Sequence, residues 1–165
     1  IAVVLHILNH AFMKSSLFMV AGGIKYRFGE VSIEKFGKLN KYMPFTVVTL
    51  VIAALSMVGI PPTGGFFSKW YLVLGALECG QYFFIAVIVI SSLLNAIYFF
   101  KVLENVFISE DAKLAEVHPK KGKLELPWQM LIPIILFGLA ILALGICNGY
   151  LVDVIKFGLP EVFLR

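Results

Sequence analysis

Charged residues are scarce in this sequence. Asp, Glu, Lys and Arg make up 15% of the 165 residues, whereas a soluble domain carries about a quarter. Hydrophobic residues reach 60%, 15 of the residues are phenylalanine, and the mean hydropathy is +0.93. This composition excludes an ordinary soluble domain and favours a chain that lies in a lipid bilayer.

Cysteine is also rare, and the sequence lacks the common motifs of enzymes. Cys79 and Cys147 form no C-x-x-C pair, so neither a disulfide framework nor a zinc site is indicated. The segment "HILNH" has metal-ligand spacing but lacks the glutamate of zinc hydrolases. No phosphate loop, nucleotide fingerprint or nucleophile elbow is present. We therefore predict no metal site, no cofactor and no catalytic centre within this chain.

The net charge of +4 is small, and its lysines and arginines gather in two connecting segments. This distribution argues against a nucleic-acid partner and is typical of membrane topology. By the positive-inside rule, segments 25–44 and 109–126 are predicted to be cytoplasmic, and the C-terminus to face outward. We expect a multi-pass protein of the plasma (inner) membrane.

Long hydrophobic runs account for most of the chain. Each exceeds the roughly 20 residues that a membrane helix needs, and each must be helical because the bilayer core offers no water to the backbone. The sequence predicts an all-α, polytopic transmembrane helical bundle with about four spans, at residues 2–24, 45–77, 82–108 and 127–151.

The second span is too long for one straight crossing, since an unbroken helix over residues 45–77 would be about 50 Å long. The stretch "GIPPTGG" lies in its middle. Proline lacks the N–H donor that a helix needs, and glycine allows a helix to end or restart. We predict a broken helix, with two half-helices separated by Gly59, Pro61, Pro62, Gly64 and Gly65.

Three basic side chains lie within the first span. His6, His10 and Lys14 are spaced i, i+4, i+8 and share one helical face. Ionisable groups are costly in a membrane, so each is a functional hypothesis. Histidine changes its charge near neutral pH, and a row bridged by water can pass protons. The alternatives are an interhelical hydrogen bond for a histidine and a snorkelling lysine.

Lys69 lies one turn into the second half-helix. The positive N-terminal end of that half disfavours a cation nearby, while the carbonyls that end the first half attract a cation or water. We therefore predict that Lys69 takes up and releases a proton. The alternative is a lysine that snorkels to the interface beside Trp70.

Accessory polar residues follow in the chain. Asn95 and Tyr98 are spaced i, i+3 and could face the same cavity. Glu78 lies in the predicted outward turn, where it is a candidate exit-side proton acceptor or an ordinary solvated carboxylate.

The segments "HILNHAFMKSSLFMVAGG" and "LSMVGIPPTGGFFSKWYL" resemble the antiporter-like large subunits of respiratory complex I, Mrp-type sodium/proton antiporters and membrane-bound hydrogenases. Such subunits contain two inverted repeats, each with a broken helix. The resemblance implies that residues 1–165 are the C-terminal part of such a subunit. It implies that Lys69 is the key proton-carrying lysine, and that Lys14 and His10 are relay residues with His6 one turn earlier. The stretch "GFFSKWYLVLGALE" looks closer to the Mrp D-type and hydrogenase-linked subgroup.

The function predicted from the residues and the resemblance is proton translocation, with sodium exchange as an open alternative. The subunit would work with other membrane subunits in a complex I-like NADH/ferredoxin-quinone oxidoreductase or an Mrp-type antiporter. FMN and iron–sulfur clusters would belong to partner subunits. Two rivals remain: a secondary transporter of a small solute, and a structural membrane anchor of a redox complex.

Overall fold

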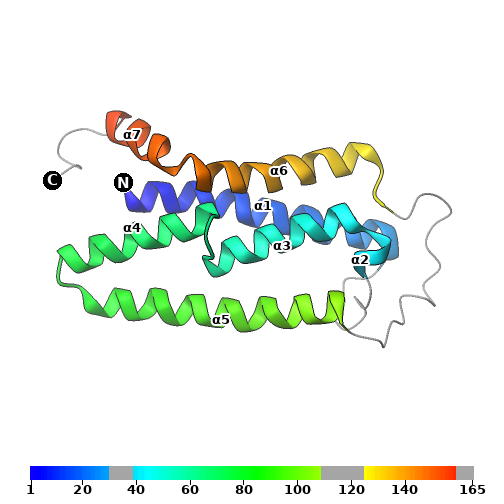
Figure 1. Cartoon of the computed structure of the whole chain (residues 1–165), viewed down its shortest axis with the longest axis horizontal. Helices are drawn as coiled ribbons and strands as arrows, with labels where there is room; N and C mark the ends of the chain where they lie inside the picture. The colour runs from blue at the N-terminus through cyan, green and yellow to red at the C-terminus, as the bar shows by residue number, and fades with distance from the viewer. Residues whose placement is uncertain (30–38, 109–124, 159–165) are drawn as a thin grey trace.

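The long helices form columns that lie side by side along the long axis of the molecule (Figure 1). The computed structural model describes residues 1–29, 39–108 and 125–158. Within these ranges the elements are all helical: α1 (Ala2–Phe28), α2 (Leu39–Tyr42), α3 (Pro44–Val58), α4 (Gly64–Glu78), α5 (Tyr82–Phe107), α6 (Trp128–Ile146) and α7 (Asn148–Gly158). The predicted all-α helical bundle is confirmed.

Three of the columns, α1, α5 and α6, are long and apolar enough to cross a membrane, as judged by their length and composition. The fourth column consists of α3 and α4, which have 15 residues each and follow one another across a break (Figure 1). At 1.5 Å per residue each half is about 22 Å long, so the two together are needed for one crossing. The predicted broken helix is therefore part of the fold.

The helix ends alternate between the two ends of the bundle (Figure 1). Phe28 at the end of α1, Pro44 at the start of α3, Phe107 at the end of α5 and Trp128 at the start of α6 lie at one end. The α4–α5 turn and α7 lie at the other end. This up-and-down order puts these four helix ends on one side of the bundle.

Two predicted spans have different limits in the structure. The first continues past residue 24 to Phe28, where Gly29 ends it with a left-handed φ of 78°. The last was expected to run to residue 151 but ends at Ile146, and the chain turns into α7 at Asn148. Cys147 caps α6 by donating its N–H to Ala143 O at 2.8 Å. Apolar composition continues across this corner, so hydropathy alone did not reveal it.

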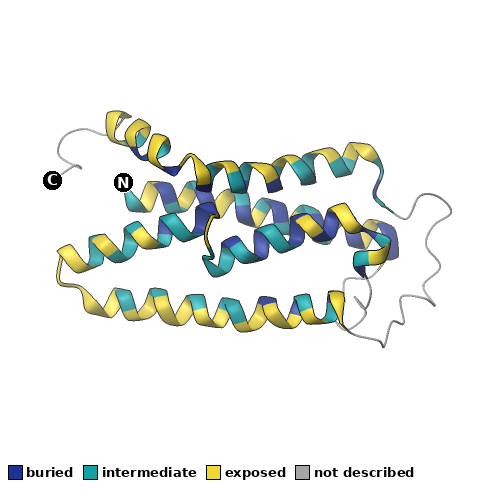
Figure 2. Ribbon diagram, viewed as in Figure 1, coloured by how far each residue is buried: buried dark blue, intermediate teal, exposed yellow. Residues whose placement is uncertain are grey.

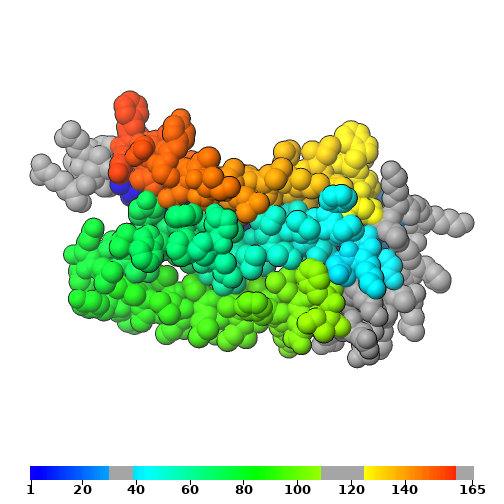
Figure 3. Space-filling model, viewed as in Figure 1, coloured from blue at the N-terminus to red at the C-terminus, as the bar shows by residue number. Residues whose placement is uncertain are grey.

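The core lies between α1, α3 and α6, and α5 packs along its edge against α3 and α4. One apolar cluster fills the end near α2 and includes Val20, Ile24, Leu39, Met43, Val47, Leu50, Val106 and Ile134. A second cluster, of Met13, Ala53 and Ile141, lies near mid-bundle. Most of α5 is exposed (Figure 2), and it forms one margin of the molecule in the space-filling view (Figure 3).

A carboxylate from a distant segment caps the start of α3. Glu125 accepts a hydrogen bond from the Phe45 N–H at 3.0 Å and another from the Thr46 hydroxyl at 2.7 Å. The first turn of a helix has unpaired N–H groups and a positive dipole end, so an anion there is favourable. This contact ties the segment before α6 to the beginning of the broken column.

Candidate functional site

The break between α3 and α4 follows directly from its residues. Gly59 takes a left-handed φ of 94°, and its N–H donates to Leu55 O at 2.9 Å, which ends α3. Pro61 and Pro62 cannot donate hydrogen bonds, so the helix cannot continue through them. Thr63 then has extended backbone angles, and its hydroxyl donates to Ile60 O at 2.7 Å. Helix resumes at Gly64.

Glycine allows other backbone segments to approach the break closely. A Cβ on Gly65 would overlap the Ser56 carbonyl oxygen, and a Cβ on Gly64 would lie 2.5 Å from the Asn9 side-chain oxygen. On the α6 side, a Cβ on Gly145 would overlap the Pro62 carbonyl oxygen. The break is therefore enclosed by α1 and α6, and these positions have no room for a larger residue.

The ammonium of Lys69 lies at the end of α3. Its Nζ donates to Met57 O at 2.7 Å, to Val58 O at 3.1 Å and to the Ser92 hydroxyl on α5 at 2.9 Å. The last carbonyls of a helix have no partner within the helix. Lys69 satisfies two of them and at the same time links α3, α4 and α5.

This geometry revises the electrostatic argument made from the sequence. The backbone of Lys69 is near the positive start of α4, but its flexible side chain carries the charge back to the carbonyl end of α3. A cation at a helix C-terminus is stabilised by the dipole. The helix end nearest to the ammonium is therefore one that favours its positive charge. The cation that the α3 carbonyls bind is the Lys69 ammonium itself.

A second polar contact ties α1 to α4 one turn before Lys69. His6 Nδ1 lies 3.1 Å from Ser68 Oγ, and the Ser68 hydroxyl donates to Gly65 O at 3.1 Å. A serine hydroxyl has one hydrogen to donate. When that hydrogen goes to Gly65 O, Ser68 accepts from His6 Nδ1–H; in the other tautomer Ser68 donates to Nδ1, so the direction of this bond follows the tautomer of His6.

The two histidines of α1 are neighbours, with ring centroids 5.9 Å apart. Together with Lys69 and Asn95 they line a cavity of about 160 Å³ between α1, α4 and α5. Space of this size holds several water molecules, each of which occupies about 30 Å³ in the liquid. The cavity brings both histidines and Lys69 into one compartment, whose wall also contains the apolar side chains of Met13, Met57, Leu72 and Ile88.

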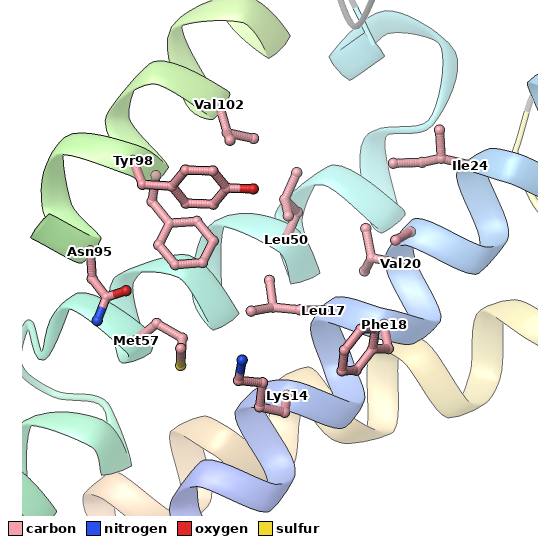
Figure 4. A pocket seen from close by; sticks show the side chains of 12 residues that line it. Lys14, Leu17, Phe18, Val20, Ile24, Leu50, Met57, Asn95, Tyr98 and Val102 are labelled. Atoms are coloured by element: carbon pink, nitrogen blue, oxygen red, sulfur yellow. The ribbon is translucent and has the colours of Figure 1, made fainter. Parts of the chain in front are cut away.

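Lys14 occupies a different compartment. It points from α1 into a cavity of about 370 Å³ that Asn95 and Tyr98 border from the α5 side (Figure 4). Met57 and Asn95 line both cavities, so the two compartments adjoin at these side chains. Lys14 and Tyr98 are exposed in this chain, while Lys69 and Asn95 are half-buried.

The structure does not bring every predicted site residue together. Glu78 is exposed at the end of α4 and lines neither cavity. Pro61 and Pro62 are exposed at the break, in contrast to the buried Gly64 and Gly65. The described residues contain no cluster of three or more His, Cys, Asp or Glu that could hold a metal ion.

Sequence reasoning missed several side chains that hold the site. Asn9 is buried and donates its amide to Gly64 O at 2.9 Å, and Ser56 accepts the Gly65 N–H at 3.1 Å. Ser68 and Ser92 hold His6 and Lys69. Their only signal in the sequence was polarity within apolar spans, which does not say which neighbour a small side chain contacts.

Comparison with known proteins identifies the family. Residues 1–95, which include α1, the break and the first half of α5, match the family described as NADH:quinone oxidoreductase/Mrp antiporter, transmembrane. The chain belongs to this family. The resemblance drawn from its two motifs is confirmed.

Individual relatives come from both branches of the NADH:quinone oxidoreductase/Mrp antiporter family. The chain is 46% identical over 164 residues to NADH-quinone oxidoreductase subunit N of Desulforudis audaxviator, covering 94% of this chain and 33% of the relative. It is 31% identical over 162 residues to the Na(+)/H(+) antiporter subunit A1 of Staphylococcus aureus, covering 92% of this chain and 20% of the relative. The chain thus spans a third or less of these relatives.

The higher of these two identities is with a complex I subunit. It runs against the preference for the Mrp D-type subgroup that the stretch after Gly65 suggested. The difference has a simple source: the quoted stretch, residues 65–78, covers only α4, whereas the identity is counted over nearly the whole chain.

Solved structures of family members share the fold. The Mrp complex from Dietzia has a chain that matches 91% of this chain with a TM-score of 0.76 and 24% identity, and 35% of that chain is covered. A chain of respiratory complex I from Thermus thermophilus matches 90% with a TM-score of 0.70 and 21% identity, and 32% of it is covered. The family, described as a transmembrane one, and the three helices long and apolar enough to cross a membrane identify this chain as part of a multi-pass membrane protein.

Proposed function

We propose that residues 1–165 form the C-terminal part of a membrane subunit that translocates protons. The observation that carries the proposal is the position of Lys69, whose ammonium lies on the carbonyl end of a broken helix beside a cavity that His6 and His10 also line. A titratable amine in contact with a water-sized cavity is the chemistry that a proton carrier needs.

In this proposal His6, His10 and Lys69 exchange protons through the smaller cavity, and Lys14 does so in the larger one. Met57 and Asn95 separate the two compartments. Lys14 is exposed in this chain, but its side chain points into a space bounded by α1, α3 and α5 (Figure 4). Asn95 and Tyr98 supply polar groups beside that space.

The rest of the assignment extends the family relationship. The subunit works within a complex I-like oxidoreductase or an Mrp-type antiporter, alongside other membrane subunits, and FMN and iron–sulfur clusters belong to those partners. Protons are the transported ions, and in an Mrp-type antiporter they are exchanged for sodium. The membrane is the plasma (inner) membrane, with the helix ends at Phe28, Pro44, Phe107 and Trp128 on the cytoplasmic side.

The volume of the cavity beside the break argues against a solute site at that point, whereas the adjoining cavity around Lys14, at about 370 Å³, is within the size range of a small-ligand site. Sites for small organic ligands have volumes of about 300–1,000 Å³, and the cavity beside the break measures about 160 Å³. A solute transporter would need its substrate site at the break, where the space suits water and protons instead.

Proton uptake into membrane vesicles that contain the complete complex tests the proposal. Lys69→Met and Lys14→Ala should each reduce uptake by about tenfold or more while the complex still assembles, because a proton-binding group is removed. Normal uptake in Lys69→Met with impaired assembly would instead support the structural anchor. Uptake of a labelled organic solute that depends on Lys69 would support the solute transporter.

A further inference from the structure

Ser92 is the partner of Lys69 whose role differs from the other two. The ammonium has three N–H donors, and the structure pairs them with Met57 O, Val58 O and Ser92 Oγ. Two of these acceptors are backbone carbonyls at the end of α3. The third is a hydroxyl on α5, which is the only one of the three that also carries a hydrogen.

Loss of a proton changes the number of hydrogen-bond donors and acceptors on Lys69 Nζ. The neutral amine keeps two N–H donors and gains one lone pair. Carbonyl oxygens can only accept, so Met57 and Val58 can retain the two remaining N–H groups but cannot serve the lone pair. The Ser92 hydroxyl can serve it by rotating its hydrogen toward Nζ.

The hydroxyl of Ser92 is available for this reversal. Its neighbour Ser91 donates its hydroxyl to Ile88 O within α5 at 3.0 Å, the usual contact of a serine in a helix. In the part of the chain that the structure describes, Ser92 Oγ bonds to Lys69 alone. The hydroxyl hydrogen is therefore uncommitted while Lys69 is charged.

We propose that Ser92 is a positioning residue for Lys69 that accepts a hydrogen bond from the ammonium and donates one to the neutral amine. The inference rests on the proposed proton-carrying role of Lys69. The proton that leaves Lys69 passes to water or a histidine of the adjoining cavity, while Ser92 keeps its own proton and only rotates its hydroxyl. Lys69 thereby stays in place through a full cycle of release and uptake.

The test compares hydroxyl, thiol and methyl groups at position 92 in the complete membrane complex. Ser92→Ala removes both hydrogen-bonding roles and should lower proton uptake by about tenfold. Ser92→Thr keeps the hydroxyl and should stay within about twofold of the wild type. Ser92→Cys keeps a weak donor and acceptor and should lie between them. Each rate is divided by the amount of assembled complex in the same vesicles.

Thr49→Val is the control, because it removes a helix hydroxyl that donates to Phe45 O within α3 at 3.3 Å and lines neither cavity. It should retain the uptake of the wild type. The inference is overturned if Ser92→Ala pumps normally, if Ser92→Thr fails to restore uptake, or if Thr49→Val has the same defect as Ser92→Ala.

Lys69→Met separates this inference from the proposed function. Impaired uptake in Lys69→Met with normal uptake in Ser92→Ala would remove the role of Ser92 and leave the proton-carrying lysine in place. Normal uptake in Lys69→Met would overturn the proposed function itself, whatever the result at position 92.

Discussion

The backbone of Gly65 lies directly against Ser56 across the helix break. The Gly65 N–H donates to Ser56 Oγ at 3.1 Å, and a Cβ at position 65 would overlap the Ser56 carbonyl oxygen. The two half-helices meet at this contact. Glycine is required here by space, and the distance between α3 and α4 sets where the Lys69 side chain can reach.

Replacing Gly65 by alanine should therefore separate the half-helices. Gly65→Ala is expected to lower the free energy of unfolding by about 1–3 kcal/mol, the usual cost of overpacking, and to reduce proton uptake because Lys69 moves from its carbonyls. Thermal unfolding of the detergent-solubilised complex measures the first effect. Gly75→Ala is the control on the same helix, since a Cβ there meets nothing within 4 Å; a Gly65→Ala protein as stable as Gly75→Ala would contradict the prediction.

The contact between His6 and Ser68 allows the two interpretations of His6 to be separated. When Ser68 donates to Gly65 O, it accepts a hydrogen bond from His6 Nδ1. Asparagine places an amide N–H near the Nδ1 position but cannot take up a proton at neutral pH. His6→Asn should thus preserve thermal stability while it lowers proton uptake several-fold. Uptake equal to the wild type would make His6 a structural residue only.

Arginine substitutions should separate Lys69 from Lys14. An arginine stays protonated and is planar and larger than lysine, so proton uptake should fall by about tenfold or more in Lys69→Arg and in Lys14→Arg. Stability should fall only in Lys69→Arg, by about 1–3 kcal/mol, because three short hydrogen bonds hold that ammonium. Lys14 lies in the larger cavity, which has room for the longer side chain. Equal melting temperatures for Lys69→Arg and Lys14→Arg would contradict the predicted difference in stability.

The cap on α3 predicts a stability effect outside the cavities. Glu125→Ala removes both hydrogen bonds to the first turn and should destabilise the protein by about 1 kcal/mol. Glu125→Gln keeps an acceptor oxygen and should retain part of the stabilisation that the carboxylate provides. Glu104→Ala, an exposed carboxylate near the end of α5, should have no measurable effect. The melting temperatures of the three variants test this order of stability. A melting temperature as low in Glu104→Ala as in Glu125→Ala would contradict the prediction.

The fold was accessible from the sequence because membrane helices follow from composition and length. The break was accessible too, since two prolines and the flanking glycines cannot continue a helix. The corner at Cys147 was not, because an apolar run does not show a change of direction. At the site, spacing placed His6, His10 and Lys14 on one face, but it could not show that Lys14 and Lys69 line separate cavities. That depends on how α5 packs, which the local pattern does not contain.

The surroundings of the break differ on its two sides. On the α1 and α6 sides there is no room for a methyl group, because Gly64 lies against the Asn9 side chain of α1 and Gly145 of α6 lies against the Pro62 carbonyl. On the α5 side the break meets a cavity of about 160 Å³ and the Lys69 ammonium, which donates to one α5 hydroxyl. Any rearrangement that follows a change in charge at Lys69 therefore has free volume on the cavity side, which α5 and the His6–His10 face of α1 border, whereas backbone contact with α6 closes the other side.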